Sequence, residues 1–265
     1  MKDKLTNIIC PLFFISKEVL FFIRRIKYER ILIRMNKSNC LICNEELIYF
    51  NESKKMKCYY CGTELYSATL CKNGHYVCNT CHSNDASKII KNYLVNSKEK
   101  NPFIMARFLE YHPSIKMHGP EHHFLVPAVL TTAYLNTIGE EYKKNQYLDE
   151  IEKRSKNVLG GFCGFYGACG SGIGNGIFIS VILNATPLSN EEWTLSNLIT
   201  SKTLKRISDY GGPRCCKRVS NIAMETAIDF IYDKFNIKLE TEGNFKCEFK
   251  KYNKECIKNR CKYFK

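Results

Sequence analysis

Apolar residues recur at helical spacing through most of the chain after residue 84. Ile89, Ile90, Tyr93 and Leu94 share one face of a helix, and Pro102 suits the first turn of the next. Strand-like alternation is scarce in this part of the chain. The pattern predicts further helices over residues 125–135, 139–158, 173–183, 193–207 and 219–235. We therefore expect a mainly α domain in which the helices pack as a bundle.

The chain before residue 85 has a different character. Short β-type runs, 46–50 and 64–67, lie between closely spaced cysteines, as in a small module that is stapled by metal. With 265 residues there is room for such a module and one larger domain. The expected parts are a basic amphipathic arm, a zinc-binding module, a helical domain and a basic cysteine-rich tail, at residues 1–35, 36–84, 85–240 and 241–265.

The module contains seven of the 15 cysteines and two of the six histidines. Cysteines two residues apart can chelate one metal from a tight turn, and two such pairs complete a tetrahedral site. Closed four-ligand sites of this kind are structural, because no coordination position stays open for a substrate. The spacing predicts two zinc ions, with the ligands Cys40, Cys43, Cys58, Cys61, Cys71, His75, Cys78 and Cys81.

Two pairings of these ligands fit the spacing. In a sequential arrangement the first two CxxC pairs hold one zinc, and the remaining four ligands hold the other. In a cross-braced arrangement the first pair shares a metal with the third pair, and the second shares one with the fourth. The 14 residues between Cys43 and Cys58 suit the hairpin of a zinc ribbon, which favours the sequential arrangement.

Four of the six histidines lie within residues 112–123. The string His118-x-x-Glu121-His122 matches an inverted zinc-peptidase motif. Its Gly-Pro pair, however, would break the single helix that this motif needs. The proline before Glu121 instead predicts the start of a helix, with His122 and His123 in its first turn. There the helix dipole keeps imidazole neutral, so that it can bind metal or act as a base.

Residues 160–176 contain eight glycines among 17 positions, and two cysteines. Backbone N–H groups of such a loop can approach an anion or a cluster closely. The loop lacks the Gly-Lys-Ser/Thr of a phosphate-binding loop and the preceding strand of a dinucleotide fold. Small residues also allow tight helix packing, which is the structural alternative. We expect Cys163 and Cys169 to bind a metal, and a cofactor to contact Gly170, Gly172 and Gly174.

A third motif, Gly-Gly-Pro-Arg-Cys-Cys-Lys-Arg at residues 211–218, leads into the last long helix. Its proline suits the first helical turn, which places Cys215 and Cys216 at the N-terminus. The helix dipole and the cations around the pair favour thiolates, so reactive thiols or strong metal ligands are expected. The tail adds three ligands for a third metal or cluster, namely Cys247, Cys256 and Cys261.

The formal net charge is +14, and residues 1–35 and 246–265 supply +11 of it. Clustered basic residues attract nucleic acid or anionic lipid without specifying either, and a biased composition explains them equally well. The apolar stretch 8–23 is interrupted by Lys17 and Glu18, so we expect neither a secretion signal nor a transmembrane segment. Metal-ligand spacing without a secretion signal indicates the reducing cytoplasm.

Three motifs together resemble a family of unassigned function, catalogued as domain of unknown function 5714. They are His-Gly-Pro-Glu-His-His at 118–123, Gly-Gly-Phe-Cys-Gly-Phe-Tyr-Gly-Ala-Cys-Gly at 160–170, and the motif at 211–218. The similarity runs from about residue 38 to residue 263. Since the family is found chiefly in anaerobic bacteria and archaea, the resemblance implies an anaerobic setting. It supplies no established activity.

Two classes of function follow. The first is an enzyme of sulfur, thiol-redox or group transfer, with Glu121 as general acid/base and an anionic small-molecule substrate or cofactor held by Arg214, Lys217 and Arg218. Thiolates in an anaerobic setting suit iron–sulfur or zinc. The centre of that enzyme is expected to use Cys163, Cys169, Cys215 and Cys216 with His118, His122 or His123. The second is a zinc-ribbon protein that binds nucleic acid or another partner without catalysis; a metal-stapled structural protein is the plainest alternative.

Overall fold

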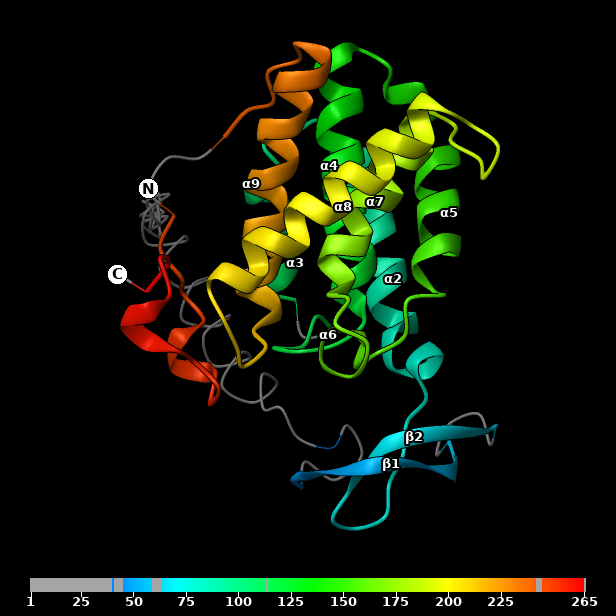
Figure 1. Cartoon of the computed structure of the whole chain (residues 1–265), viewed down its shortest axis with the longest axis vertical. Coiled ribbons are helices and arrows are strands. Elements are labelled where there is room, and N and C mark those ends of the chain that lie inside the picture. The colour runs from blue at the N-terminus through cyan, green and yellow to red at the C-terminus, as the bar shows by residue number, and fades with distance from the viewer. Residues whose placement is uncertain (1–39, 41–44, 59–62, 113, 242–244, 265) are drawn as a thin grey trace, which may run out of the picture.

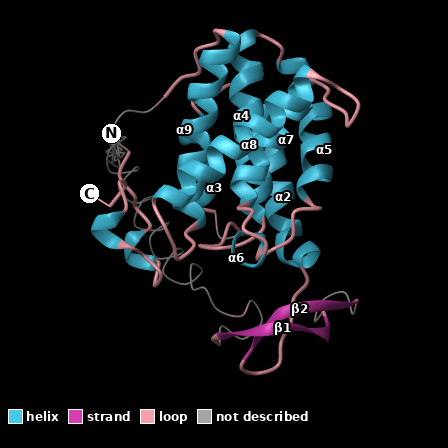
Figure 2. Cartoon of the chain, viewed as in Figure 1, coloured by secondary structure: helices cyan, strands magenta, loops and turns pink. Residues whose placement is uncertain are grey.

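The computed structural model describes residues 40, 45–58, 63–112, 114–241 and 245–264. They form a mainly α fold with one small two-stranded sheet, so the predicted fold class is confirmed. Figure 1 shows the hairpin at one end of the helical part, and Figure 2 shows that the helices lie together while the two strands stand apart from them. The basic arm, residues 1–35, lies outside the described residues.

The sheet is an antiparallel pair of β1 (Leu47–Lys57) and β2 (Glu64–Cys71). The pairing runs from Leu47 opposite Cys71 to Lys57 opposite Glu64, with an irregularity between Tyr49 and Lys54. Most side chains of β1 are exposed, so the hairpin buries little apolar surface of its own. Because an isolated two-stranded hairpin is marginally stable in water, this module needs another source of folding energy.

The helices begin and end where local chemistry favours it. Pro102 is the first residue of its helix, and the Asn101 side chain before it accepts the Phe103 N–H at 3.0 Å. Gly139 ends the next helix in the left-handed region, with φ of 77°. The elements are α2 (Asn79–Asn96), α3 (Pro102–Glu110), α4 (Glu121–Ile138), η1 (Glu141–Lys143), α5 (Lys144–Ser155), α6 (Phe162–Phe165), α7 (Gly170–Ile182), α8 (Glu191–Asp209), α9 (Cys216–Phe235), η2 (Lys250–Tyr252) and η3 (Lys258–Arg260).

Helix α4 runs through the middle of the helical part and packs against α2, α3, α5, α7 and α9. It is apolar on nearly every side, and Leu125, Val129 and Leu130 are fully buried. Helix α7 lies between α4 and α8 and is also largely buried. The Asn175 side chain of α7 donates at 2.8 Å to the Thr203 hydroxyl of α8 and to the Ala223 carbonyl of α9, so one amide links three helices.

The N-terminal ends of α4, α7 and α9 lie at the same end of the helical part, the end nearer the hairpin (Figure 1). Two expected boundaries are wrong. The helix expected over 139–158 begins only at Lys144, after the turn η1, and α9 begins at Cys216, so Pro213 precedes the helix. In the part of the chain that the structure describes, no helix combines the length and apolarity needed to cross a membrane.

Candidate metal centres

The hairpin module brings together three of the ligands expected from the sequence. Ligand atoms of Cys40, Cys71 and His75 all lie within 4.8 Å of one another, and the first two residues are buried. The Cys71 sulfur lies 3.4 Å from Nδ1 of His75 and accepts the backbone N–H of the same histidine at 3.3 Å. Two thiols and an imidazole at this separation are a possible metal-binding group, since thiolate and imidazole are the usual soft ligands in proteins.

A second pair of ligands meets in the same module. The Cys58 sulfur accepts the backbone N–H of Cys78 at 3.3 Å, and both residues are buried. Cys40 therefore lies with the third ligand pair, and Cys58 lies with the fourth. This grouping is that of the cross-braced arrangement, so the sequential pairing that the 14-residue gap favoured is wrong. The remaining expected ligands lie outside the described part of the module, namely Cys43, Cys61 and the side chain of Cys81.

The repeated turns of the module explain the cross-brace. The N–H of Cys40 donates to the Glu45 carbonyl, and the N–H of Cys58 donates to the Thr63 carbonyl, five residues on in each case. Each of these turns lies at one end of β1, so the strand separates the two CxxC pairs. Because β1 is extended, Cys40 and Cys58 are held apart, and each meets its partners at the end of β2 or beyond it.

The hairpin contacts the helical part through Arg214, the residue before the two adjacent cysteines. Its guanidinium donates to the Tyr49 hydroxyl at 2.6 Å and lies 5.5 Å from the centre of that ring. Arg214 is also close enough to Cys216 for its positive charge to oppose the rise in the pKa of that thiol. The predicted catalytic role of Arg214 stays a prediction, and the structure gives this side chain a position between the hairpin and the thiols.

Three thiols converge at the starts of α7 and α9. Cys169 is the residue before α7 and Cys216 is the first residue of α9. Cys216 lies close enough to Cys169, and Cys169 to Cys163, for each neighbour to raise the pKa of the thiol beside it. Among the described residues, no three ligand atoms of this group lie within 4.8 Å of one another, in contrast to the hairpin module. The three thiols are therefore not drawn together as the ligands of a single ion.

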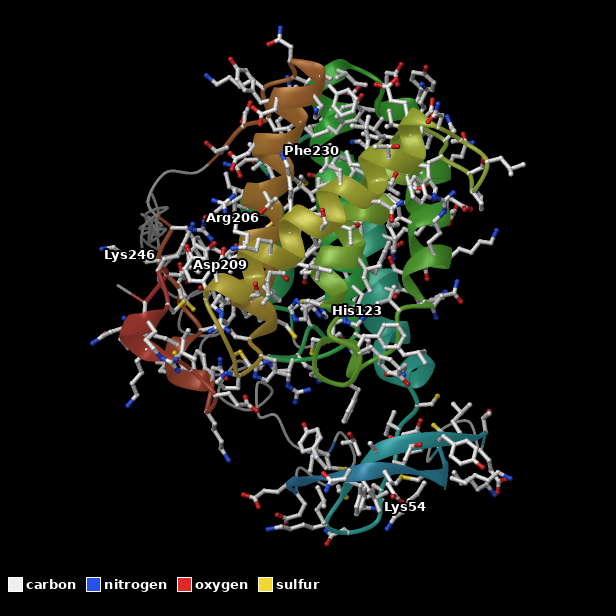
Figure 3. The ribbon with its side chains drawn as sticks, in the orientation of Figure 1. Lys54, His123, Arg206, Asp209, Phe230 and Lys246 are labelled. Carbon is white, nitrogen blue, oxygen red and sulfur yellow. The ribbon has the colours of Figure 1, made fainter. Side chains whose placement is uncertain are left out.

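His123 joins this group from the first turn of α4, at the end of the bundle that faces the hairpin (Figure 3). Its Nδ1 lies 2.8 Å from the Val158 carbonyl, so Nδ1 carries the proton and Nε2 is left as the metal-binding nitrogen. The ring lies against Gly170, directly after Cys169. A Cβ at position 170 would lie 2.3 Å from Nε2, which is why only glycine fits there. Burial lowers the pKa of His123 and keeps the imidazole neutral, as a ligand must be.

Burial controls the protonation of these thiols. It raises the pKa of Cys216, and it does so despite the N–H of Gly119 and the nearby Arg214, which both act in the opposite direction. It also raises the pKa of Cys169, although the N–H groups of Ser171 and Gly172 point at that sulfur. Desolvation thus opposes the helix dipole and the cations at Cys215 and Cys216. The reactivity expected for this pair stays a prediction.

The two adjacent cysteines face different neighbours. Cys215 is buried and borders a cavity that the tail closes, together with Cys247, Cys256 and Cys261. Burial raises the pKa of Cys215 too, and the neighbouring Cys261 adds to the effect. The expected grouping of Cys215 with Cys163 and Cys169 is therefore replaced by a grouping with the tail. Of the two, Cys216 is the one that lies near Cys169, in the loop before α7.

Two residues of the first turn of α4 that were expected to be catalytic have structural contacts. Glu121 is 1% exposed, and its Oε1 accepts the Lys116 N–H at 2.8 Å, so the carboxylate closes the loop before the helix. His122 is equally buried and donates from Nε2 to the Lys116 carbonyl at 3.1 Å. Burial lowers the pKa of His122 to about 3. Both side chains are thus bonded to the loop before the helix, and their expected catalytic roles stay predictions.

His118, expected as a metal ligand, binds the tail. Its Nε2 lies 2.6 Å from the Glu255 carboxylate and 3.1 Å from the Asn253 side-chain oxygen. This hydrogen bond is the main cause of the lowered pKa of Glu255. The histidine thus holds the tail against the loop before α4. The sequence gives no signal for this partner, because nothing in the local pattern distinguishes Glu255 from Glu242 and Glu248 in the same basic tail.

The residues expected to hold a cofactor or an anion are mostly explained by packing. A Cβ at Gly172 would lie 2.7 Å from Leu204 of α8, and one at Gly174 would lie 2.9 Å from Pro127 of α4. These glycines therefore allow close helix contacts. Lys217 is 1% exposed, with its ammonium 4.8 Å from the centre of the Phe249 ring, so it cannot meet a ligand from solvent. Arg218 donates to the carbonyls of Gly211 and Pro213, both at 2.8 Å.

The sequence did not indicate that the carboxyl group of Glu110 is buried. Glu110, the last residue of α3, is 3% exposed, and its Oε1 has no hydrogen-bond partner among the described residues. It lies 3.9 Å from Nδ1 of His122 and close to the charge of Lys217. Burial raises its pKa to about 7. An apolar helix end with one glutamate looks like an ordinary surface position in the sequence, so no signal was available.

The basic tail is partly engaged within the molecule. Lys262 pairs with Glu225 of α9, and the ammonium of Lys250 lies 4.8 Å from the centre of the Phe264 ring. The arm at 1–35, which carries the other basic cluster, is not among the described residues. Binding of nucleic acid through the basic ends therefore stays a prediction.

Comparison with known proteins gives a family without an assigned function. A model described as "Family of unknown function (DUF5714)" matches residues 90–264, so the hairpin module lies outside the match. No curated protein and no solved structure matches the chain.

Proposed function

The chain belongs to the family of unknown function DUF5714, and we propose that it is a metal- or iron–sulfur-dependent enzyme. Its reactive centre is formed by Cys163, Cys169, Cys216 and His123. The hairpin module is a separate structural part with two zinc ions, whose binding supplies folding energy that the exposed strands cannot. Sulfur transfer, thiol redox and group transfer all suit a centre of three thiolates and one imidazole.

The observation that carries the proposal is that one thiol of this centre is exposed and none of the three is fully buried. Cys163 is exposed, whereas Cys169 and Cys216 are both intermediate. The ligands of the hairpin module differ, because Cys40, Cys58, Cys71 and Cys78 are all buried. Catalytic metal sites keep one position open to substrate, whereas structural sites are closed by protein ligands. The open side at Cys163 therefore supports catalysis at this centre.

The surroundings of the centre favour an anionic substrate. The starts of α4, α7 and α9 lie at this end of the bundle, and helix N-termini carry partial positive charge. Arg214 adds a full positive charge close to Cys216. Phe165 and Tyr166 are both exposed beside Cys163 and offer apolar contact to a small molecule. Such a centre needs reduced thiols, which agrees with the expected cytoplasmic, anaerobic setting.

The test is metal and sulfide analysis of the full chain, purified without oxygen. His123→Gln keeps the size of the side chain but removes the ligand nitrogen, and His112→Gln is the matched control, because that half-buried histidine bonds only its local loop. Cys169→Ser is compared with Cys10→Ser in the same way. We expect His123→Gln and Cys169→Ser each to lose the metal of one centre and the absorption bands of that centre. Both controls should keep the metal and the bands.

Two outcomes would reject the proposal. Unchanged metal and sulfide content in both His123→Gln and Cys169→Ser would mean that these residues hold no centre. Zinc alone, in an amount that variants of the hairpin module account for fully, would favour the binding protein without catalysis.

A further inference from the structure

The tail closes a cavity over the start of α9, and four cysteines border it. Cys215 comes from the residue before α9, and Cys247, Cys256 and Cys261 come from the tail. All four are free thiols. Figure 1 shows the tail at the side of the helical part, next to α9 and away from the loop that carries α6. The four thiols thus form a group separate from the centre at Cys163.

The spacing of these four thiols differs from that of the hairpin ligands. A single zinc holds its sulfurs at about 2.3 Å, which brings them to within about 4 Å of one another. Among the described residues, only Cys40, Cys71 and His75 form a group of three ligand atoms within 4.8 Å. No three of the thiols around the tail cavity are that close to one another, so they are not drawn together as the ligands of a single ion. Four cysteine thiolates are the usual ligands of an iron–sulfur cluster.

The cavity walls suit a cluster as well. Phe249, Met117 and Ile257 border the cavity and are buried, so the thiols face an apolar, water-poor space. The Cys247 sulfur accepts the N–H of Phe249, and the Cys215 sulfur accepts the N–H of Arg218. Backbone N–H groups that bond ligand sulfurs stabilise the negative charge of a cluster and set its potential.

A buried cation lies at the same place. The Arg218 side chain borders the cavity and is 5% exposed, and its Nε has no hydrogen-bond partner among the described residues. Its Nη2 donates to the carbonyls of Gly211 and Pro213, and a negatively charged cluster beside the guanidinium would offset the remaining cost of burying its charge. If the tail were only an apolar cover for the bundle, four free thiols would not be needed around the cavity.

We propose that Cys215, Cys247, Cys256 and Cys261 hold an iron–sulfur cluster in this cavity. The site is independent of the reactive centre proposed above, although its ligand Cys215 is the neighbour of Cys216. The two adjacent cysteines therefore belong to two different centres, one on each side of the start of α9. The cluster also fixes the tail, since three of its four ligands lie there.

The experiment compares two serine variants in the full chain purified without oxygen. Cys261→Ser removes a ligand of the tail cluster, and Cys169→Ser removes a ligand of the other centre. Iron, acid-labile sulfide and electron paramagnetic resonance after reduction are measured for both and for the wild type. We expect Cys261→Ser to lose the iron and sulfide of one cluster, while Cys169→Ser keeps that cluster. Loss in Cys169→Ser alone would overturn this proposal and leave the reactive centre standing.

The cluster in the tail cavity can also be tested by a substitute variant and by the composition of the wild-type protein. If Cys261→Ser does not fold, judged by circular dichroism, Cys256→Ala is used in its place. A wild-type protein without acid-labile sulfide overturns the proposal whatever the variants do. A loss of one zinc and no iron in Cys261→Ser also overturns it, because the site then holds a single ion.

Discussion

The buried carboxyl of Glu110 should make the stability of the protein depend on pH. Its carboxyl lies at the end of α3, almost without exposure, near Lys217 and the neutral His122. Burial raises the pKa of Glu110 from 4.5 to about 7, and the two nearby cations, Lys217 and Arg107, only partly oppose this rise. The perturbation is Glu110→Gln, which imitates the protonated acid and cannot ionise.

The size of the effect follows from the two pKa values. The folded protein binds the Glu110 proton more tightly than the unfolded chain does, so stability is greatest below pH 4.5 and falls as the pH rises toward 7. A pKa difference of one corresponds to about 1.4 kcal/mol, which gives a loss of about 3 kcal/mol above pH 7. The uncharged amide of the Glu110→Gln variant does not suffer this loss. The variant should match the wild type at pH 4 and be more stable by up to about 3 kcal/mol at pH 8.

The assay is urea unfolding followed by circular dichroism at several pH values, on samples whose metal content is equal. Glu240→Gln, at an exposed position, is the control and should shift stability little at any pH. If Glu110→Gln is the less stable protein at pH 8, the reasoning is refuted. Glu110 would then be ionised in the folded state and paired with Lys217, and the variant would leave that buried ammonium without its counter-charge.

Three further variants test the packing and the module. Gly176→Ala should lower the free energy of unfolding by about 1 kcal/mol, because its Cβ would lie 2.1 Å from the Thr200 hydroxyl. This overpacking exceeds the gain in helix propensity. The control Gly164→Ala has open space around its Cβ and should leave the free energy of unfolding unchanged in the same melting experiment. Asn175→Ala should cost about 1–3 kcal/mol, read from the urea midpoint, because two buried groups lose their donor. Cys40→Ser should release about one metal equivalent, measured by mass spectrometry of the eluted metal, and full retention would show that Cys40 is no ligand.

Local sequence signals predicted most of the helical part. A proline opens α3 and another precedes α4, so these two starts follow from fixed backbone preferences. The end of α4 was not predicted, because Gly139, which closes it, was expected to begin the next helix. The continuous apolar character of residues 173–183 correctly indicated that α7 is buried. Its glycines were harder to interpret, because a close approach to a ligand and a close approach to a neighbouring helix require the same small residue.

The directions of adjacent side chains could not be predicted. Cys215 and Cys216 follow each other in the sequence, but one precedes the helix in extended conformation while the other begins the helix. Their side chains therefore leave the backbone on different sides. Which thiols they meet depends on the tail folding back onto α9 and on the loop before α7. These are long-range contacts that no local pattern encodes.

The cross-braced pairing of ligands in the hairpin module could not be predicted from the sequence for a related reason. Spacing gives the number of ligands, and both pairings satisfy it equally. What decides is that β1 extends from one CxxC pair to the other and holds them apart. The length of that strand was underestimated, since the sequence indicated only residues 46–50 and the strand runs to Lys57.

The central claim is that Cys163, Cys169, Cys216 and His123 hold a metal or cluster with one open side. Anomalous diffraction at the iron and zinc absorption edges, from crystals grown without oxygen, tests it most directly. We expect an anomalous peak enclosed by these four side chains, in addition to the peaks of the hairpin module. A map with peaks in the hairpin module but none between Cys169 and Cys216 would contradict it.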